Sequence, residues 1–210
     1  MELYFAPLAC SMATRIALYE AGADARYIQR GRDKRLADGS DFYQINSLGM
    51  VPTLRTDDGA LLTENAAILQ YVAASFPQAE LAPAGGIARA RLQQWLSFIG
   101  TELHKAVFIP LLQAKAPTEA KTYARGLAEA RLGILDKHLT DREFLLDKFS
   151  VADAYLFTVL NWSRAANVDL APWPAIMAYI KRLRARPSVA KALAEERALY
   201  EAEAASHKAA

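Results

Sequence analysis

The chain begins with a candidate β-strand, Glu2-Leu3-Tyr4-Phe5, which leads through Ala6-Pro7-Leu8-Ala9-Cys10-Ser11 into a helical stretch, Met12 to Ala21. Cys10 is the only cysteine of the 210 residues, and it lies where the strand gives way to the helix. A thiol at a helix N-terminus faces unpaired backbone N–H groups and the positive end of the helix dipole, and both favour the thiolate. A lone cysteine is also commonly a buried, inert residue. The stretch therefore predicts a strand–turn–helix unit whose thiol is either reactive or packed.

The composition is that of a globular protein, and it narrows the classes of function. The formal net charge is only +2, from 25 basic and 23 acidic residues, so the sequence offers no basic face for nucleic acid. No apolar run reaches the roughly 20 residues that span a bilayer, and charged residues and a proline interrupt any signal-peptide core. One cysteine and three scattered histidines show no metal-ligand spacing, and no internal disulfide can form. We expect a cytoplasmic protein that binds neither nucleic acid, membrane nor metal.

Short strand-like and helix-like segments alternate over residues 1–77. After the first strand and helix, the pattern predicts a strand at 25–30, a short helix or turn at 40–45, strands at 52–55 and 60–63, and a helix at 64–75. The last two strands flank Asp57-Asp58-Gly59, and Asp-Gly is typical of a hairpin turn because it tolerates positive φ. The order β-α-β-α-β-β-α predicts a small mixed sheet with helices on its faces.

The second half of the chain is predicted to be all-helical. Prolines and glycines mark a linker at about 77–86, so we expect one domain at 1–77 and another at 87–210. Helical spacing of apolar residues predicts a helix that runs to Pro110, followed by helices at 118–139, 151–162 and 174–185 and a last helix that starts at Pro187. Ser150-Val151-Ala152-Asp153 forms a capping-box pattern before the helix at 151–162.

Five short motifs run along the chain: Ala9-Cys10-Ser11, Met50-Val51-Pro52, Leu62-Thr63-Glu64-Asn65, Thr101-Glu102-Leu103-His104-Lys105 and Ser150-Val151-Ala152-Asp153-Ala154-Tyr155-Leu156-Phe157. In their order and spacing, over nearly the whole chain, they resemble the bacterial beta class of cytosolic glutathione transferases. The resemblance implies a thioredoxin-like α/β N-terminal domain, an all-α C-terminal domain, glutathione as co-substrate and a homodimer. The implied homodimer agrees with the general rule that isologous dimers are the commonest oligomers.

The resemblance also implies how the first domain holds glutathione. Pro52 is expected to be a cis-proline that leaves the Val51 N–H and C=O to pair with the cysteine of glutathione in strand fashion. Glu64 and Asn65 are assigned to the γ-glutamyl amine and carboxylate, since helix-start N–H groups bind a carboxylate and Glu64 matches an ammonium. Plain helix capping is the alternative reading of this pair. Asn65 departs from the Gly or Ser common at this position in the family.

Lys34 falls where the family has a lysine that reaches the glycine carboxylate of glutathione. Arg35 is its rival, because this loop leaves one residue of register open. A solvated cluster of charges, Arg32-Asp33-Lys34-Arg35, is the alternative to a binding role.

His104 lies on the first long helix of the second domain, and the resemblance implies that its imidazole faces the glutathione sulfur. A pKa near neutral suits either hydrogen bonding or proton transfer there, whereas a structural histidine is the alternative. Further contacts with glutathione are expected from the same helix, at Ser97 (where the family has Asn), Thr101, Glu102 and Leu103.

The expected function is conjugation of glutathione to small hydrophobic electrophiles, as in detoxification. Cys10, Ser11 and His104 are expected to stabilise the glutathione thiolate. Ser11 is also the candidate helix cap, and Tyr4 is a rival activating hydroxyl. In a redox version, the Cys10 thiolate attacks a disulfide and forms a mixed disulfide with glutathione, which a second glutathione resolves because Ala13 excludes a Cys-x-x-Cys pair. A reductive dehalogenase and a non-catalytic binder of apolar ligands are the alternatives on this fold.

Overall fold

The computed structural model describes residues 1–209, with side chains described through residue 206. The chain forms two compact units. The first contains Met1–Leu81 together with the C-terminal segment from Pro187 onward, and the second contains Ala82–Arg186. The predicted domains at 1–77 and 87–210 stay predictions, and the C-terminal helix belongs to the first compact unit.

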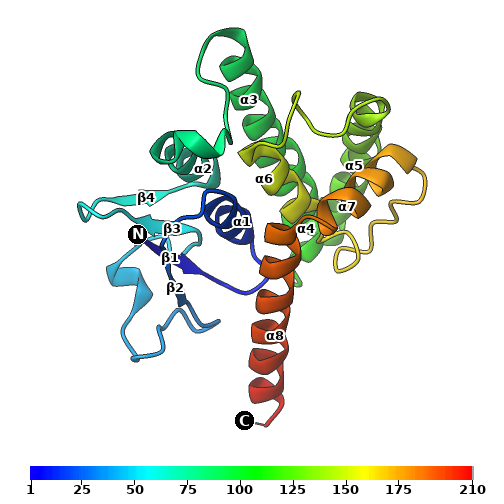
Figure 1. Ribbon diagram of the computed structural model, residues 1–210. Helices are drawn as coiled ribbons and strands as arrows, with labels where there is room; N and C mark the ends of the chain where they lie inside the picture. Colours follow the sequence, from blue (N-terminus) through cyan, green and yellow to red (C-terminus); the bar gives the residue numbers. More distant parts are fainter. Residues whose placement is uncertain (210) are drawn as a thin grey trace. The chain divides into compact units, whose positions relative to one another are not determined.

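A four-stranded mixed sheet forms the centre of the first unit (Figure 1). Its order is β2-β1-β3-β4, with β1 parallel to β2 and antiparallel to β3, and with β3 antiparallel to β4. The register places Leu3 beside Tyr27 on one side and Leu54 on the other. The strands are β1 (Glu2–Phe5), β2 (Arg26–Gln29), β3 (Thr53–Arg55) and β4 (Leu61–Thr63). This arrangement confirms the thioredoxin-like prediction.

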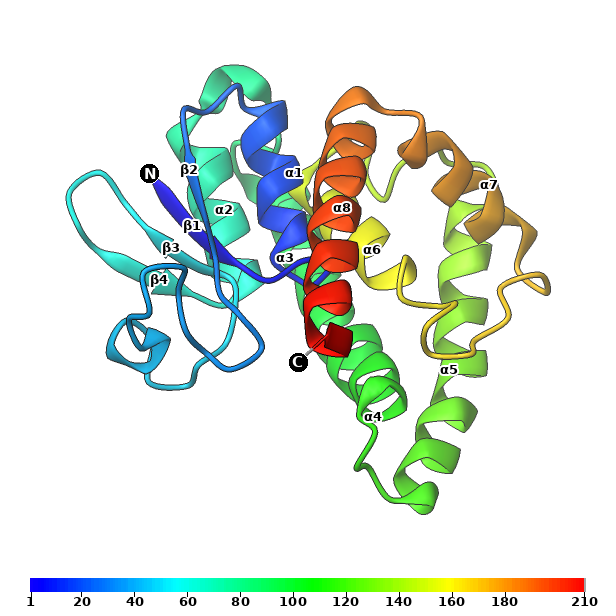
Figure 2. The same ribbon diagram turned by 90° about the horizontal axis from the view of Figure 1, so that it is seen from below.

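Three helices complete the first unit. Helix α1 (Met12–Glu20) packs against both α2 (Asn65–Ser75) and α8 (Pro187–Ala209), and Figure 2 shows it between them. α1 is buried from Met12 to Leu18, because it is covered by the sheet and by two neighbouring helices. The segment predicted as a short helix or turn at 40–45 is a single 3₁₀ turn at Phe42–Gln44, and Phe42 packs its ring on Tyr4.

The predicted hairpin between β3 and β4 is confirmed. Thr56 N–H donates to the Ala60 carbonyl at 2.9 Å and closes the turn. Gly59 has a φ of +87°, a conformation that costs a glycine little and other residues much. The Asp-Gly pair thus sets the strand register through local backbone geometry.

The second unit is helical throughout its regular elements. Its first rod consists of α3 (Gly86–Phe98), a π-helical segment (Ile99–Phe108) and α4 (Ile109–Leu112). The remaining helices are α5 (Thr118–Leu139), α6 (Val151–Leu160) and α7 (Pro174–Arg184). The predicted helix up to Pro110 is therefore present, but its residues 99–108 are π-helical, because apolar spacing alone does not distinguish i→i+4 from i→i+5 hydrogen bonding. Every residue of α6 is buried, as its apolar sequence predicts.

A capping box starts α6, as the sequence predicts. The Asp153 carboxylate accepts hydrogen bonds from the Ser150 N–H and from the Ser150 hydroxyl, both at 2.9 Å. Its other oxygen accepts from the Leu145 N–H at 2.9 Å and from the Tyr179 hydroxyl at 2.8 Å. Burial raises the pKa of Asp153, and these four donors oppose the rise. The capping box therefore connects the start of α6 to α7 and to the loop that precedes α6.

Within the part of the chain that the structure describes, no helix combines the length and the apolar character that crossing a membrane requires.

Replacement of Ser150 by Ala is expected to lower the free energy of unfolding by about 1 kcal/mol, because the helix start and Asp153 each lose a partner. For a chain of this size that corresponds to a fall in melting temperature of about 2–4 °C. Ser206→Ala is the matched control, since its exposed hydroxyl donates to the Ala202 carbonyl of its own helix. A melting temperature of Ser150→Ala equal to that of the control would contradict the assigned cap.

Candidate functional site

Cys10 lies at the end of a tight turn between β1 and α1. The turn is closed by the Ala9 N–H, which donates to the Ala6 carbonyl at 3.1 Å, and by the Met12 N–H, which donates to the Ala9 carbonyl at 3.0 Å. Cys10 is half-buried, and its thiol donates to the Val51 carbonyl at 3.1 Å. The turn therefore brings the start of α1 against the residue that precedes Pro52.

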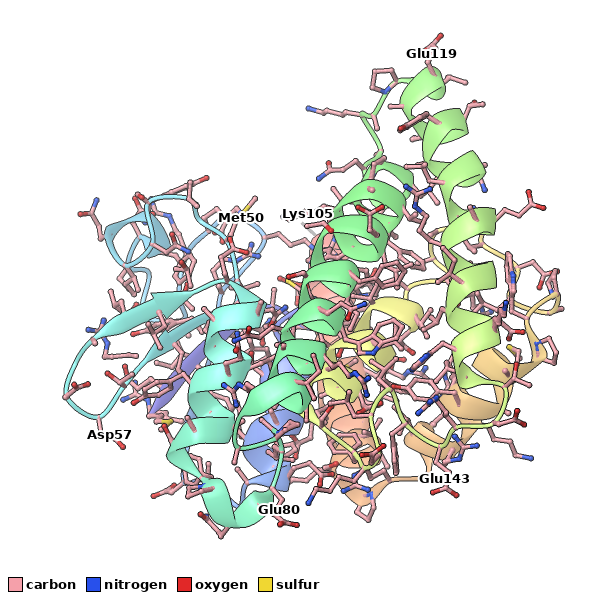
Figure 3. All side chains as sticks on the ribbon, turned by 90° about the horizontal axis from the view of Figure 1, so that it is seen from above. Met50, Asp57, Glu80, Lys105, Glu119 and Glu143 are labelled. Atoms are coloured by element: carbon pink, nitrogen blue, oxygen red, sulfur yellow. The ribbon has the colours of Figure 1, made fainter. Side chains whose placement is uncertain are left out.

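The loop before β3 presents Val51 to this thiol. The Val51–Pro52 peptide bond is cis, as the resemblance implies. Just before it, the Met50 carbonyl accepts from the Asn46 amide at 2.9 Å and from the Thr53 hydroxyl at 3.2 Å, while the Met50 side chain is exposed (Figure 3). Gly49 has a φ of +60°, and a Cβ there would lie 2.6 Å from the Tyr43 ring. The loop is thus held in place by side chains of the same unit.

Ser11 is the N-cap residue of α1, as predicted, but its hydroxyl makes no capping hydrogen bond to the helix. Ser11 has helical backbone angles (φ −60°, ψ −21°), whereas a capping side chain usually stands on an extended residue. Its buried hydroxyl instead lies 3.3 Å from both the N–H and the carbonyl of Ala6. Ser11 therefore braces the turn in front of Cys10.

Glu64 and Asn65 start α2 and differ in where their side chains lie. Glu64 is exposed, and its φ of +68° is uncommon for a residue with a side chain. Asn65 is buried; its amide nitrogen donates to the Cys10 carbonyl at 2.9 Å, and its amide oxygen accepts from the Thr14 hydroxyl at 3.2 Å. The Asn65 side chain thus ties the start of α2 to the Cys10 turn.

Lys34 and Arg35 donate hydrogen bonds to different parts of the first unit. Lys34 Nζ donates to the Gly49 carbonyl at 2.8 Å, two residues before Val51. Burial lowers the pKa of Lys34, with a smaller contribution from Arg30. Arg35 is exposed and donates to the Gly39 carbonyl at 2.8 Å. Of the two rivals, Lys34 is the one that contacts the loop carrying Val51.

In the second unit, the predicted contacts lie along the rod formed by α3 and the π-helical segment. Ser97 and Thr101 are exposed, and the Thr101 hydroxyl donates to the Ser97 carbonyl at 3.0 Å. Glu102 pairs with Arg131 of α5 at 2.9 Å, and Leu103 is fully buried. The last two side chains therefore have packing partners inside their own unit.

His104 is buried in the second unit against two aromatic residues. Its Nδ1 lies 2.7 Å from the Tyr155 hydroxyl, and its ring meets the Trp162 ring edge-on at 5.0 Å. Burial, with a smaller contribution from Lys105 (labelled in Figure 3), lowers the pKa of His104 to about 4. Burial therefore favours the neutral imidazole at physiological pH.

The structure brings Cys10, Ser11, Val51 and Asn65 together by hydrogen bonds within the first unit, and Lys34 joins them through Gly49. The predicted residues of the second unit follow one another along a single rod.

Sequence reasoning missed three residues that hold this region by hydrogen bonds: Thr14, Tyr155 and Glu196. Thr14 stands one helical turn after Cys10, which is a usable signal, whereas nothing local marks Glu196, which lies 188 residues from its partner Leu8. No group of three or more His, Cys, Asp or Glu side chains suited to a metal occurs among residues whose placement is described.

Comparison with known proteins assigns both parts of the chain. Residues 1–74 match the family model "Glutathione S-transferase, N-terminal domain", and residues 100–187 match "Glutathione S-transferase, C-terminal domain". Glutathione S-transferase GstA of Escherichia coli O157:H7 is 41% identical over 199 residues, which cover 93% of this chain and 98% of GstA. The chain belongs to the glutathione S-transferase family. The enzymes of this family use glutathione as co-substrate.

Further bacterial proteins are similar to this transferase. Glutathione S-transferase GST-4.5 of Xanthomonas campestris is 35% identical over 205 residues, which cover 93% of this chain and 98% of GST-4.5. The solved ternary complex of BphK, a bacterial GST, matches with a TM-score of 0.90 and 45% identity, over 93% of this chain and 99% of BphK. The bacterial beta class transferase of Sphingomonas chungbukensis matches with a TM-score of 0.89 and 43% identity, over 93% and 98% of the two chains. These matches support the beta-class resemblance.

The neutral state of His104 is directly testable. We expect its ring carbon NMR signals to stay constant from pH 8 to about pH 5.5 and to titrate with a midpoint near 4, because burial disfavours the imidazolium. The His104→Gln variant identifies the signals. Since the pKa in the folded state lies below the unfolded value of about 6.5, the group's contribution to stability is complete above that pH and is lost as the pH falls toward 4. A titration midpoint near 6.5 in the native protein would contradict the assignment.

Proposed function

We propose that this transferase conjugates glutathione to small hydrophobic electrophiles and also exchanges thiols through Cys10. The observation that carries the proposal is the contact between the Cys10 thiol and the Val51 carbonyl. It puts the sole thiol of the chain at the start of α1 and beside a backbone segment that ends in a cis-proline. A peptide-like thiol that paired with Val51 as a strand would place its own sulfur next to Cys10.

The charged ends of glutathione have candidate partners in the same unit. Glu64 is exposed at the N-terminus of α2, where a carboxylate can meet an ammonium and helix-start N–H groups can meet a carboxylate. The Asn65 side chain is engaged with Cys10, so we assign the carboxylate contact at this position to the Asn65 backbone N–H. Lys34, held beside the loop, is our candidate for the glycine carboxylate.

Two reactions follow from this arrangement. In conjugation, the glutathione thiolate attacks the electrophilic carbon, a carbon–sulfur bond forms and the leaving group departs with its electron pair. In thiol transfer, the Cys10 thiolate attacks the glutathione sulfur of a mixed disulfide, forms the Cys10–glutathione disulfide and releases the other thiolate. A second glutathione thiolate then attacks that disulfide, which yields glutathione disulfide and restores Cys10.

His104, Ser97, Thr101, Glu102 and Leu103 are kept as proposed contacts on the strength of the resemblance. A neutral His104 acts as a hydrogen-bonding group and not as a cation. The homodimer, the cytoplasmic location and the division into domains at 1–77 and 87–210 also stay predictions.

The test compares wild type, Cys10→Ala and Cys10→Ser in two assays, conjugation of a chloronitrobenzene and glutathione-dependent reduction of a small disulfide. We expect both variants to lose thiol transfer by about 100-fold or more, because neither offers a thiolate. Cys10→Ser keeps a hydroxyl that can donate to Val51, so it is expected to conjugate within about threefold of wild type because that hydrogen bond is retained. Retention of disulfide reduction by Cys10→Ala would refute the nucleophile role, and loss of neither activity would refute any catalytic role of Cys10.

A further inference from the structure

Helix α8 supplies a buried acidic residue to the first unit that the proposed reactions do not use. Glu196 is fully buried, and its Oε1 lies 2.9 Å from Nε of Arg15 on α1. Arg15 is itself only 4% exposed, and its guanidinium carbon lies 4.2 Å from the ring centres of both Phe5 and Tyr27. The Arg15 guanidinium is thus held between two aromatic faces and a carboxylate.

Stability alone is a weak reason for this pair. Two buried charges must be stripped of water, and well-packed apolar residues of similar size are often at least as stabilising. The desolvation is visible in Glu196: burial raises its pKa to about 7, although Arg15 and the Leu8 N–H oppose the rise. The second carboxylate oxygen of Glu196 indicates another role for the pair.

That oxygen binds the Cys10 turn. Glu196 Oε2 accepts a hydrogen bond from the Leu8 N–H at 2.7 Å. Leu8 has a φ of +58°, a left-handed conformation that is uncommon for a branched side chain, so the turn relies on its partners to hold this shape. Cys10 follows two residues later and is fixed from the other side by the Asn65 amide. The turn is therefore held between the start of α2 and the middle of α8.

We propose that Glu196, with Arg15 as its charge partner, is a positioning residue that holds the Leu8–Cys10 turn and so sets the reactivity of the Cys10 thiol. Only the consequence of this positioning for catalytic turnover rests on the proposed function. It makes the C-terminal helix part of the thiol site, and it gives the buried charge a purpose that an apolar residue could not serve.

The test measures alkylation of the protein by iodoacetamide between about pH 5 and 9. Cys10 is the only cysteine, so the rate reports this thiol alone and needs neither glutathione nor an electrophilic substrate. In Glu196→Gln the single amide oxygen can serve Arg15 or Leu8 but not both. We expect the alkylation rate constant at pH 7 to fall about threefold to tenfold, the scale of one hydrogen bond.

Two further variants separate positioning from folding. Glu195→Gln is the matched control, because Glu195 pairs with the same Arg15 at 3.0 Å, whereas the Leu8 N–H donates to Glu196. We expect its alkylation rate to stay within about twofold of wild type. The double variant Arg15→Met/Glu196→Leu replaces the pair by apolar side chains, so it is expected to fold, with a lower melting temperature because the Leu8 N–H loses its acceptor, and to show slow alkylation.

An unchanged or faster alkylation of Cys10 in Glu196→Gln and in the double variant would overturn the proposal, as would an equal effect in Glu195→Gln. If Glu196→Gln does not fold, the double variant alone decides the question. A failure of the proposed function shows differently: Cys10→Ala would then keep its disulfide reductase activity, while the alkylation rates would still depend on Glu196.

Discussion

The hydrogen bond from the Cys10 thiol to the Val51 carbonyl is the interaction on which the rest of this account depends. It follows from the sheet. Antiparallel pairing sets Tyr4 of β1 opposite Thr53 of β3. The residues that follow Phe5 and the residues that precede Thr53 therefore lie at the same end of the two strands. A turn that leads from β1 into α1 and a loop that leads into β3 must then meet there. The thioredoxin-like topology by itself thus brings the thiol at the start of α1 to the backbone of Val51.

The turn at Cys10 keeps its shape through buried polar groups from distant parts of the chain. Asn65 binds the Cys10 carbonyl from α2, Ser11 braces Ala6, and Glu196 binds Leu8 from α8. Each of these groups is desolvated, and each would destabilise the fold if it lost its partner. Their position around one cysteine is consistent with a site whose geometry is set before a substrate arrives.

Local chemistry explains which parts could be predicted from the sequence. The Asp57-Asp58-Gly59 hairpin and the Ser150–Asp153 capping box depend on residues close together in the chain, and both were confirmed. The cis-proline at Pro52 and the fold came through resemblance, because five motifs in register carry more information than any one of them. Ser11 precedes α1 as predicted, but its helical backbone and missing capping hydrogen bond do not show in the sequence, and the π-helical segment around His104 has the apolar spacing of an ordinary helix. The low pKa of His104 and the inward amide of Asn65 depend on burial by residues far away in sequence, which no local pattern reveals.

The central claim is that the backbone of Val51 binds the cysteine of glutathione beside Cys10. Hydrogen exchange of the Val51 amide, followed by NMR with and without an unreactive S-alkyl glutathione, tests it most directly. The account predicts that saturation with this analogue slows exchange at Val51 about tenfold or more, because its N–H becomes paired in strand fashion. Exchange at Val51 that is unchanged while the analogue is bound would contradict the account.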